Sequence, residues 1–465
     1  MCGILGVIGG NIDIGTFVNC LESLSTRGQE AAGLTGFVNG FVSEKCQGTA
    51  VNLEKNIPNP SEIIDVCIGS TRYSTIGTLK KETMQVHLAP FIESTSKGML
   101  SLAFNGNIIF PLINGEENDG ALLTKLLKHN LEDNQDIYLA VKNLISEVDG
   151  AYSTLALIGD DKLIAFRDPN GIRPLCYGKT DGGYIVSSET RILEKLGINS
   201  YQFIPPGSLF IFTRDSLEKH RITFQDSHHC MFEWTYFSQA PSNIDGKEVY
   251  QVRFQLGEIL GKLLQKRKIK DIDYIIPVPN TAKTAALGCA SSMKIQYADG
   301  LIKGSSGRIF IQPTQKERFK AVRKVYEIVP SVIKDKNLIV IDDSIVRGTT
   351  LKRVIELLRE KGAKSIHVGI TTPMIKYPCV YGIDMSRPGE LLASSNTEKK
   401  IAKIINCETL TYMTIKDLHE AIGVEGLCTA CLDRNYPTER AETLVKNISL
   451  MNEEVRLYEQ NSVSR

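Results

Sequence analysis

Cys2, the second residue of the chain, follows Met1 and could act as a nucleophile. The initiator methionine can be removed before a small residue, and Cys2 would then carry both a thiol and a free α-amine. An α-amine titrates near pH ~7.7–8.0, so it can act as the general base for the thiol beside it. A Met-Cys start is equally compatible with an incidental or buried thiol, so other residues must decide between the two interpretations.

A second candidate site follows the apolar run 337–341, which is typical of a buried strand. The run leads into Asp342 and Asp343, then into a segment rich in hydroxyl groups that contains Gly348, and then into a helical pattern. A strand, a loop of small residues and a helix N-terminus together bind anions, because backbone N–H groups and the helix dipole favour negative charge. Adjacent carboxylates suit ribose hydroxyls or Mg²⁺. A helix-capping Asp-rich turn explains a lone Asp pair but not the whole segment.

The cysteines suggest thiol or metal chemistry. The chain has 11 of them, an odd number, and its start lacks the pattern of a secretory signal, so a disulfide framework is not expected. Cys428 and Cys431 form a C-x-x-C motif, which is compatible with a redox pair, with zinc or with chance. Counted alone, four thiolates would hold zinc or an iron–sulfur cluster equally well.

The composition is that of a globular protein of more than one domain. The chain has 465 residues, 42% of them hydrophobic, and its 54 Lys and Arg balance 53 Asp and Glu. The chain lacks the excess of basic residues that would indicate nucleic-acid binding, and no apolar run is long enough to span a bilayer. We therefore expect a cytoplasmic enzyme with no nucleic-acid or membrane partner.

The first 220 or so residues must position Cys2, and they are rich in strand patterns separated by irregularly placed helices. This mixture predicts a layered α+β domain rather than a parallel βαβ domain. The expected strands are 33–38, 101–105, 151–158, 163–167 and 184–188, and the expected helices are 14–25, 120–129 and 137–148.

After about residue 245 the pattern changes to strands alternating with helices, which predicts an α/β domain with a parallel sheet. The expected strands are 273–277, 337–342 and 365–371, and the expected helices are 249–266 and 351–361. A C-terminal helix is expected from the spacing of Leu444, Ile448, Met451 and Val455. The domain boundaries are predicted at 2–230, 231–410 and 411–465.

The first half contains an ordered series of motifs that resembles the class II glutamine amidotransferases, whose glutaminase domain uses an N-terminal nucleophile. The series is Cys2-Gly3-Ile4-Leu5-Gly6, Arg27-Gly28-Gln29-Glu30, Thr71-Arg72-Tyr73-Ser74, Phe104-Asn105-Gly106-Asn107, Arg167-Asp168-Pro169-Asn170-Gly171 and Ser187-Ser188-Glu189-Thr190. The resemblance implies a four-layer αββα sandwich over residues 2–230.

The same resemblance implies a role for each matched residue. Cys2 is expected to be the nucleophile, and Asn105 and Gly106 to form the oxyanion hole. Arg72 is expected to bind the α-carboxylate of glutamine and Asp119 its ammonium group. The flanks of Asp119 differ from the family pattern, and a solvated loop carboxylate is the alternative.

Arg27 resembles the family arginine that couples this site to a second one. Two neighbouring positions depart from the family, which commonly has His where this chain has Thr26 and Phe104. Neither replaced residue is a nucleophile or an oxyanion donor, so glutaminase chemistry is expected to survive.

The segment from Asp342 to Thr350 matches the 5-phosphoribosyl-1-pyrophosphate (PRPP) signature of type I phosphoribosyltransferases. The match implies a parallel sheet with helices on both faces and a small hood. It also implies that Asp342 and Asp343 hold the ribose hydroxyls and Mg²⁺. The expected 5-phosphate cradle is Ser344, Arg347, Gly348, Thr349 and Thr350.

Over residues 2–440 the chain resembles the glutamine PRPP amidotransferase family. The resemblance implies that ammonia released from glutamine reacts with PRPP to give 5-phosphoribosylamine, the first step of purine biosynthesis. The loop 303–311 keeps Lys303 and Arg308 as PRPP ligands but is one residue shorter than usual, and Ala282 replaces a family serine. These changes motivate an alternative, a paralogue that binds PRPP or nucleotide as a regulator. An aminosugar- or asparagine-forming amidotransferase would leave the 342–350 segment without a role.

One branch of that family carries a [4Fe–4S] cluster, and its ligand positions match cysteines of this chain. The expected ligands are Cys230, Cys379, Cys428 and Cys431. The family further implies purine nucleotides as inhibitors and a homotetramer built as a dimer of dimers.

Overall fold

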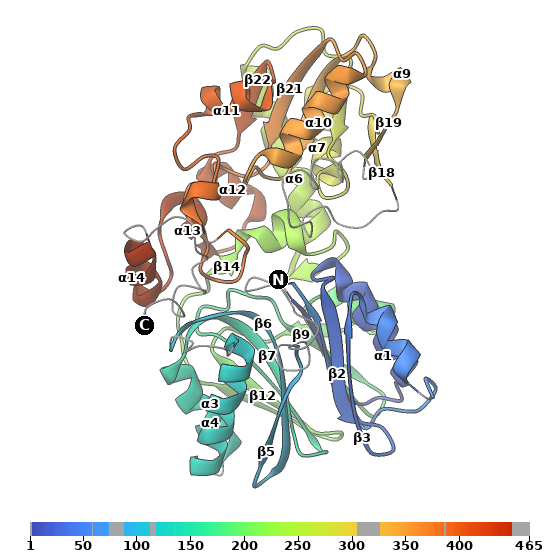
Figure 1. Ribbon diagram of the computed structural model, residues 1–465, viewed down its shortest axis with the longest axis vertical. Helices are drawn as coiled ribbons and strands as arrows, with labels where there is room; N and C mark the ends of the chain where they lie inside the picture. Colours follow the sequence, from blue (N-terminus) through green and yellow to red (C-terminus); the bar gives the residue numbers. More distant parts are fainter. Residues whose placement is uncertain are drawn as a thin grey trace.

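The computed structural model describes residues 2–57, 59–73, 88–111, 118–134, 136–304, 326–385 and 387–448. Two lobes lie one above the other in Figure 1, and the beginning of the chain lies at the junction between them. The first half of the sequence forms the lower lobe, and most of the second half forms the upper lobe.

Two antiparallel sheets form the lower lobe. Within the described residues, the first sheet has the order β11 (Tyr201–Phe203), β9 (Cys176–Thr180), β10 (Gly183–Ser187), β1 (Gly3–Gly9), β4 (Val66–Arg72), β2 (Ala31–Phe37) and β3 (Phe41–Gln47). The second has the order β13 (Leu217–Arg221), β12 (Ser208–Phe212), β8 (Lys162–Arg167), β7 (Asp149–Ile158), β6 (Gly98–Phe110) and β5 (Phe91–Thr95). The strand β1 is thus central in its sheet and carries Cys2 immediately before it.

Helices cover the outer face of each sheet. The first sheet packs against α1 (Ile14–Ser23) and α5 (Thr190–Lys195), and the second against α3 (Asp119–Asn134) and α4 (Ile137–Glu147). A separate apolar core between the sheets includes Ile4, Ile68, Leu155 and Ala165. The lower lobe therefore has the predicted four-layer αββα architecture, with short 3₁₀ turns at Leu24–Thr26 and Ala50–Asn56.

A connecting segment joins the lobes. It contains β14 (His229–Cys230), the π-helix η3 (Glu233–Phe237), and the short pair β15 (Asn243–Ile244) and β16 (Lys247–Glu248). The strand β14 pairs in parallel with β23 (Leu427–Cys428). Two segments 198 positions apart in sequence, at Cys230 and Cys428, therefore lie side by side.

The upper lobe is built on a parallel sheet, as expected. Its order is β17 (Tyr274–Pro277), β20 (Asn337–Asp342), β21 (Ser365–Ile370) and β22 (Thr409–Tyr412). Side chains of β20 alternate between its two faces: Ile339 and Ile341 join the core with α6 (Val249–Lys266), α7 (Lys283–Met293) and α12 (Ile415–Ile422). Leu338 and Val340 join the core with α10 (Thr349–Glu360) and α11 (Glu398–Ile405).

Smaller elements complete this lobe. The antiparallel ribbon β18 (Leu301–Lys303) and β19 (Tyr326–Ile328) lies beside the sheet, and the remaining helices are α9 (Pro330–Ile333), the 3₁₀ turn η5 (Pro388–Glu390), α13 (Ala430–Asp433) and α14 (Glu439–Ile448).

Several predicted elements are present with different ends. The expected strand 101–105 is the middle of the longer β6, and the expected helix 120–129 continues to Asn134. The expected helix 14–25 ends at Ser23 and tightens into a 3₁₀ turn. Periodicity locates buried faces, but it does not register exposed ends such as those of β6. Of the C-terminal helix, α14 reaches Ile448, and Met451 and Val455 lie outside the described residues.

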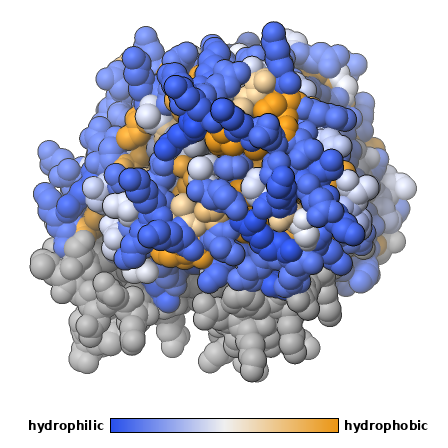
Figure 2. All heavy atoms as spheres, turned by 90° about the horizontal axis from the view of Figure 1, so that it is seen from above, coloured by the Kyte–Doolittle hydropathy of each residue, from blue (hydrophilic) through white to orange (hydrophobic). Residues whose placement is uncertain are grey.

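The upper end of the molecule, seen in Figure 2, is mainly hydrophilic with smaller apolar patches between the polar side chains. Among the described helices, none is both long and apolar enough to cross a membrane.

Candidate active sites and cysteine cavity

Cys2 is held in place by partners from two distant parts of the chain. Its backbone N–H donates to the Oδ1 of Asn105 at 3.1 Å, and its carbonyl accepts from the Nε of Arg27 at 3.1 Å. The next residues are fixed by Thr71, whose hydroxyl accepts from the Gly3 N–H, and by Ser188, whose hydroxyl accepts from the Ile4 N–H. The Cys2 side chain is partly exposed, so a substrate can reach the thiol.

Asn105 and Gly106 lie beside Cys2 on β6. The side chain of Asn105 is fully buried, and its Nδ2 has no hydrogen-bond partner among the described residues. A buried amide donor without a partner is unfavourable unless a ligand uses it. At position 106 a Cβ atom would lie 1.7 Å from the carbonyl oxygen of Ala151, so glycine is required for the pairing of β6 with β7. The pair can therefore supply donors to an oxyanion formed near Cys2.

Arg72 and Asp119 are the expected contacts for the two charged ends of glutamine. Arg72 ends β4, next to the Thr71 that fixes Gly3, and Asp119 begins α3. Burial raises the pKa of Asp119 to about 6, while the Ile108 N–H and the charge of Arg72 act in the opposite direction. Asp119 is half-buried and lies within the electrostatic field of Arg72, which fits a carboxylate that binds an ammonium group, and its role stays a prediction.

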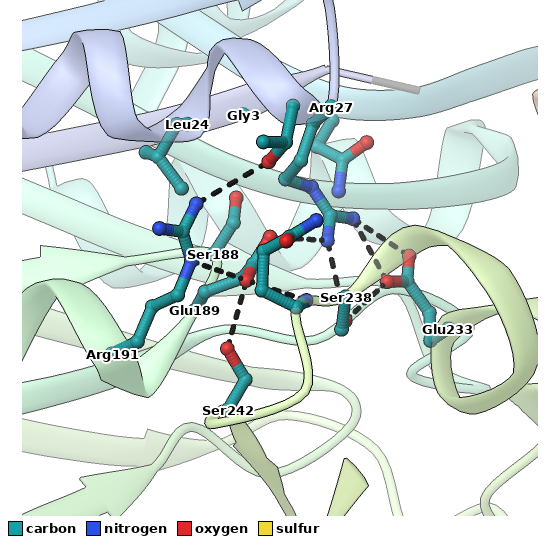
Figure 3. Close-up of polar contacts among 12 residues, drawn as sticks. Gly3, Leu24, Arg27, Ser188, Glu189, Arg191, Glu233, Ser238 and Ser242 are labelled. Carbon is teal, nitrogen blue, oxygen red and sulfur yellow. Dashed lines mark hydrogen bonds and ion pairs between the residues drawn. The ribbon is translucent and has the colours of Figure 1, made fainter. Parts of the chain in front are cut away.

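Arg27 is the centre of a buried ion-pair network, shown in Figure 3. It is fully buried and donates two hydrogen bonds to the carboxylate of Glu233, at 2.8 and 2.9 Å, and one to Glu189 at 3.2 Å. Burial alone would lower the pKa of Arg27, but Glu233 and Glu189 together raise it above its usual value. Glu233 belongs to the π-helix at the lobe junction. Arg27 therefore connects the Cys2 backbone directly to the segment that leads into the upper lobe.

The strand β20 ends at the acidic pair. Asp342 and Asp343 are 8% and 6% exposed, so both carboxyl groups are nearly removed from water. Burial and mutual repulsion raise the pKa of Asp342 well above its ordinary range, and burial also raises that of Asp343. Ser344 donates to Asp343 at 2.6 Å, and Thr281 donates to the same carboxylate. A cation held here would lower both pKa values, and two carboxylates with substrate phosphates form a usual Mg²⁺ environment.

The cradle after the acidic pair has the expected backbone. Gly348 has a φ of +72° and caps α10, and the first helical residues are Thr349 and Thr350. The left-handed conformation favours glycine and aims the helix N-terminus at the end of β20. The guanidinium of Arg347, a predicted member of the cradle, pairs with Glu390 and Asp384.

The remaining PRPP ligands are only partly described. Lys303 ends β18, is exposed, and is opposite Tyr326 in the β18–β19 ribbon. Arg308 and the rest of the shortened loop lie outside the described residues. Ala282 is buried immediately before α7, beside the Thr281 that contacts Asp343.

The four predicted cluster cysteines line one cavity at the lobe junction. Its remaining lining is mostly apolar and aromatic and includes Ile172, Phe232, Tyr381, Ile383 and Tyr436. The lining cysteines are Cys230, Cys379, Cys428 and Cys431. Burial raises the pKa of Cys230 to about 11, although nearby Arg173 lowers it, and burial also raises the pKa of Cys428 and Cys431.

The donors of this cavity are four thiols, a set that can hold zinc or an iron–sulfur cluster. Among the described residues, no group of three or more His, Cys, Asp or Glu is arranged to hold one metal ion. The choice of a [4Fe–4S] cluster therefore stays a prediction from the family resemblance.

The sequence did not assign roles to several residues that complete these sites. Glu189 and Glu233 stand within quoted motifs, but the pairing of both with Arg27 depends on the tertiary structure. Asn107 donates to the carbonyl of Val380, so the strand that carries Asn105 contacts the loop that carries Cys379. The signal in the sequence that could have indicated such a role is a charged residue inside an apolar segment, and Glu233 is an example.

A cysteine at position 2 beside a buried amide donor without a partner among the described residues, and a loop of small residues before a helix on a parallel sheet, are features that a two-site amidotransferase requires. A family model described as "Phosphoribosyl transferase domain" matches residues 248–377. The amidophosphoribosyltransferase of Methanocaldococcus jannaschii is 35% identical, with 94% of this chain and 98% of that protein covered. The amidophosphoribosyltransferase of Bacillus subtilis is also 35% identical, with 94% of each covered.

Solved structures agree over the same extent. The structure of the B. subtilis glutamine PRPP amidotransferase complexed with ADP and GMP matches with a TM-score of 0.82 and 32% identity, covering 94% of this chain and 98% of that one. A structure described as the allosteric regulatory enzyme of purine biosynthesis matches with a TM-score of 0.84 and 33% identity, covering 94% and 96%. The chain belongs to the amidophosphoribosyltransferase family.

Proposed function

We propose that the chain converts glutamine, PRPP and water to 5-phosphoribosylamine, glutamate and pyrophosphate, the first step of purine biosynthesis. The observation that carries the proposal is the likeness to amidophosphoribosyltransferases across 94% of the chain, which includes both candidate sites.

In the glutamine half-reaction, the thiol of Cys2 attacks the side-chain amide carbon, and the α-amine of Cys2 takes the thiol proton. The oxyanion of the tetrahedral intermediate accepts hydrogen bonds from the Asn105 Nδ2 and the Gly106 N–H. The protonated α-amine then returns this proton to the amide nitrogen, so that collapse releases ammonia and leaves a thioester, which water hydrolyses to glutamate and the free thiol. Arg72 and Asp119 hold the α-carboxylate and the ammonium group of the substrate, so that the amide is presented to the thiol.

In the PRPP half-reaction, ammonia attacks C1 of the ribose and pyrophosphate leaves. Asp342 and Asp343 would hold the ribose hydroxyls and Mg²⁺, and the N-terminus of α10 would hold the 5-phosphate. Mg²⁺, when bound, supplies positive charge to the leaving pyrophosphate. The site must exclude bulk water, because ammonia protonated in solution is not a nucleophile.

The proposal includes a [4Fe–4S] cluster held by the four cysteines of the junction cavity. Its support is that all four cysteines line the same cavity, at the positions where the family resemblance places cluster ligands. Iron and acid-labile sulfide should be found in equal amounts, near four of each per chain, in protein purified without oxygen. Stoichiometric zinc would contradict this assignment.

Regulation and assembly extend the proposal. The matched B. subtilis structure holds ADP and GMP. We expect purine nucleotides to inhibit this chain as well, in a cytoplasmic homotetramer built as a dimer of dimers. Sedimentation with and without GMP would test the assembly.

The decisive experiment follows glutamate and pyrophosphate together, in anoxic protein, with and without PRPP and Mg²⁺. We expect PRPP to stimulate glutamate release and pyrophosphate to appear in equal amount. Cys2→Ser should lose glutamine-dependent synthesis by about 10³-fold or more and retain ammonia-dependent synthesis. Glutamate release that ignores PRPP, without pyrophosphate, would instead support the regulatory paralogue.

A further inference from the structure

The π-helix Glu233–Phe237 at the lobe junction is held by buried arginines from both lobes. From the lower lobe, Arg27 binds the carboxylate of Glu233 at 2.8 and 2.9 Å. From α6 of the upper lobe, Arg253 donates through Nε to the carbonyl of Trp234 and through a terminal nitrogen to that of Ser238, both at 2.7 Å. Single π-turns are rare and often occur at functional sites.

Ser238 is contacted from both sides. Its hydroxyl donates to Glu233 at 3.0 Å and lies 3.4 Å from a donor nitrogen of Arg27, as Figure 3 shows, while its carbonyl accepts from Arg253. A shift of the Arg253 guanidinium therefore moves the same residue that holds the Arg27–Glu233 pair. Arg27 in turn donates to the Cys2 carbonyl at 3.1 Å, so the contacts continue to the nucleophile.

The charge of Arg253 is balanced differently from that of Arg27. The side chain is 5% exposed, and both of its hydrogen bonds described above end on neutral carbonyls. No ion pair of Arg253 occurs among the described residues, whereas Arg27 pairs with two carboxylates. Burial lowers the pKa of Arg253 to about 10, and the charges that oppose this are Asp343 and Glu189.

Of these two opposing charges, Asp343 belongs to the PRPP site and Glu189 to the Arg27 network. A buried guanidinium without a contacting carboxylate responds strongly to a change in charge nearby, because the surrounding dielectric is low. Binding of Mg²⁺ and PRPP changes the charge around Asp343. The free energy of the Arg253 contacts therefore differs between the empty and the loaded PRPP site, as any coupling device requires.

We propose that Arg253 is a positioning residue that transmits occupancy of the PRPP site to Cys2, through the Trp234 and Ser238 carbonyls, the π-helix and the Glu233–Arg27 pair. This inference rests on the proposed function and adds to it the route by which one site activates the other. Arg253 does not contact the reacting atoms; its effect is on the position of the segment that carries Glu233.

Three rates measured on Arg253→Gln and Arg253→Lys test the route: ammonia-dependent synthesis, glutamate release without PRPP, and glutamate release with PRPP and Mg²⁺. In Arg253→Gln we expect the stimulation by PRPP to fall at least about tenfold, within the usual range of coupling between sites. The other two rates should change less than about threefold, because neither requires communication. Arg253→Lys keeps the charge but not both hydrogen bonds, so its stimulation should be intermediate.

Arg353→Gln is the matched control. Arg353 on α10 is 9% exposed and pairs with Glu356 and Glu360, away from the junction. Its substitution should leave the stimulation unchanged. Unchanged stimulation in folded Arg253→Gln would overturn the proposal, as would an equal loss of all three rates, which indicates a structural role. Absence of any PRPP-dependent product in the unsubstituted enzyme would instead defeat the proposed function.

If the Arg253 variants do not fold, hydrogen exchange in the unsubstituted enzyme decides the question. The backbone amides of 233–238 should change their exchange rate when PRPP and Mg²⁺ are added. No change there, while segments around Asp343 become protected, would show that occupancy is not transmitted along this route.

Discussion

The glutamine site and the PRPP site differ in how completely the protein balances their buried charges. Around Cys2, Arg27 is paired with Glu233 and Glu189, and the strands that carry the site are fixed by hydrogen bonds. Around β20, two neighbouring carboxyl groups are buried together, and the nearby cation Arg253 forms no ion pair with either of them among the described residues.

This difference indicates which site depends on its ligand to balance its buried charge. The glutamine site is preorganised, with one unpartnered donor, the Asn105 Nδ2, left for the oxyanion. The expected PRPP site has two adjacent buried carboxyl groups, and a bound cation would relieve the repulsion between them. An enzyme that must not release ammonia before PRPP binds benefits from this arrangement, because the incomplete site is the one whose loading can shift the other. Four substitutions would break or sharpen the comparison.

The largest expected effect is on the paired charges at the lobe junction. Glu233→Gln removes the carboxylate that Arg27 contacts twice and leaves two arginines, Arg27 and Arg173, without it. Breaking one partner of a buried ion pair costs about 3–5 kcal/mol. Chemical unfolding should show a loss of that order, whereas the exposed Glu248→Gln should change the free energy of unfolding by less than about 0.5 kcal/mol. Equal stabilities of the two variants would contradict the network described here.

Asn105→Ala should have the next largest effect. It removes the free Nδ2 donor while leaving the thiol in place, and loss of one oxyanion donor lowers kcat by about 10²–10³-fold. Glutamate release should fall by this amount with little change in KM for glutamine, and ammonia-dependent synthesis should persist. A change confined to KM would show that Asn105 binds the substrate rather than the transition state.

The motifs of the sequence predict both sites because each motif is local. Each motif can be recognised within one strand or loop, as with Cys2, the Asn105-Gly106 pair and the Asp342–Thr350 segment. The layered and the parallel sheets were predicted from the periodicity of the surrounding strands and helices. The partners of Arg27 could not be predicted, because Glu189 and Glu233 reach it from 162 and 206 positions away.

Arg347 shows what a motif leaves open. It stands inside the phosphate motif, yet its side chain pairs with Glu390 and Asp384, 43 and 37 positions further along the chain. Motif membership fixes the backbone of a loop, whereas the direction of a long side chain depends on charges that the fold brings near it.

A smaller effect is expected from Asp119, through pH. Because its pKa is raised to about 6, the carboxylate is charged above that pH and can bind the ammonium group of glutamine. As the pH falls through about 6, Asp119 becomes neutral and kcat/KM for glutamine should decline. Asp119→Asn should lower kcat/KM by about 10–100-fold, as expected for a charged hydrogen bond, and remove this limb of the pH profile. A profile that is unchanged in the variant would assign the ammonium contact elsewhere.

The smallest expected effect is a gain in stability, whereas the other substitutions cause losses, and this makes it the sharpest test of the comparison. The folded pKa of Asp342 is raised, so its stabilising contribution is present at low pH and is lost as the pH rises through that value. At neutral pH, which is above the pKa of the unfolded carboxyl group, burial of Asp342 beside Asp343 therefore costs free energy, and Asp342→Asn should raise the stability of the ligand-free protein by about 1 kcal/mol. The gain should shrink in acid, and the stabilisation that Mg²⁺ and PRPP give the unsubstituted protein should disappear. Asp335→Asn, at an exposed turn with positive φ, is the control that should change neither quantity. A destabilised Asp342→Asn would mean that the fold already balances this pair without a ligand, and that the two sites are built alike.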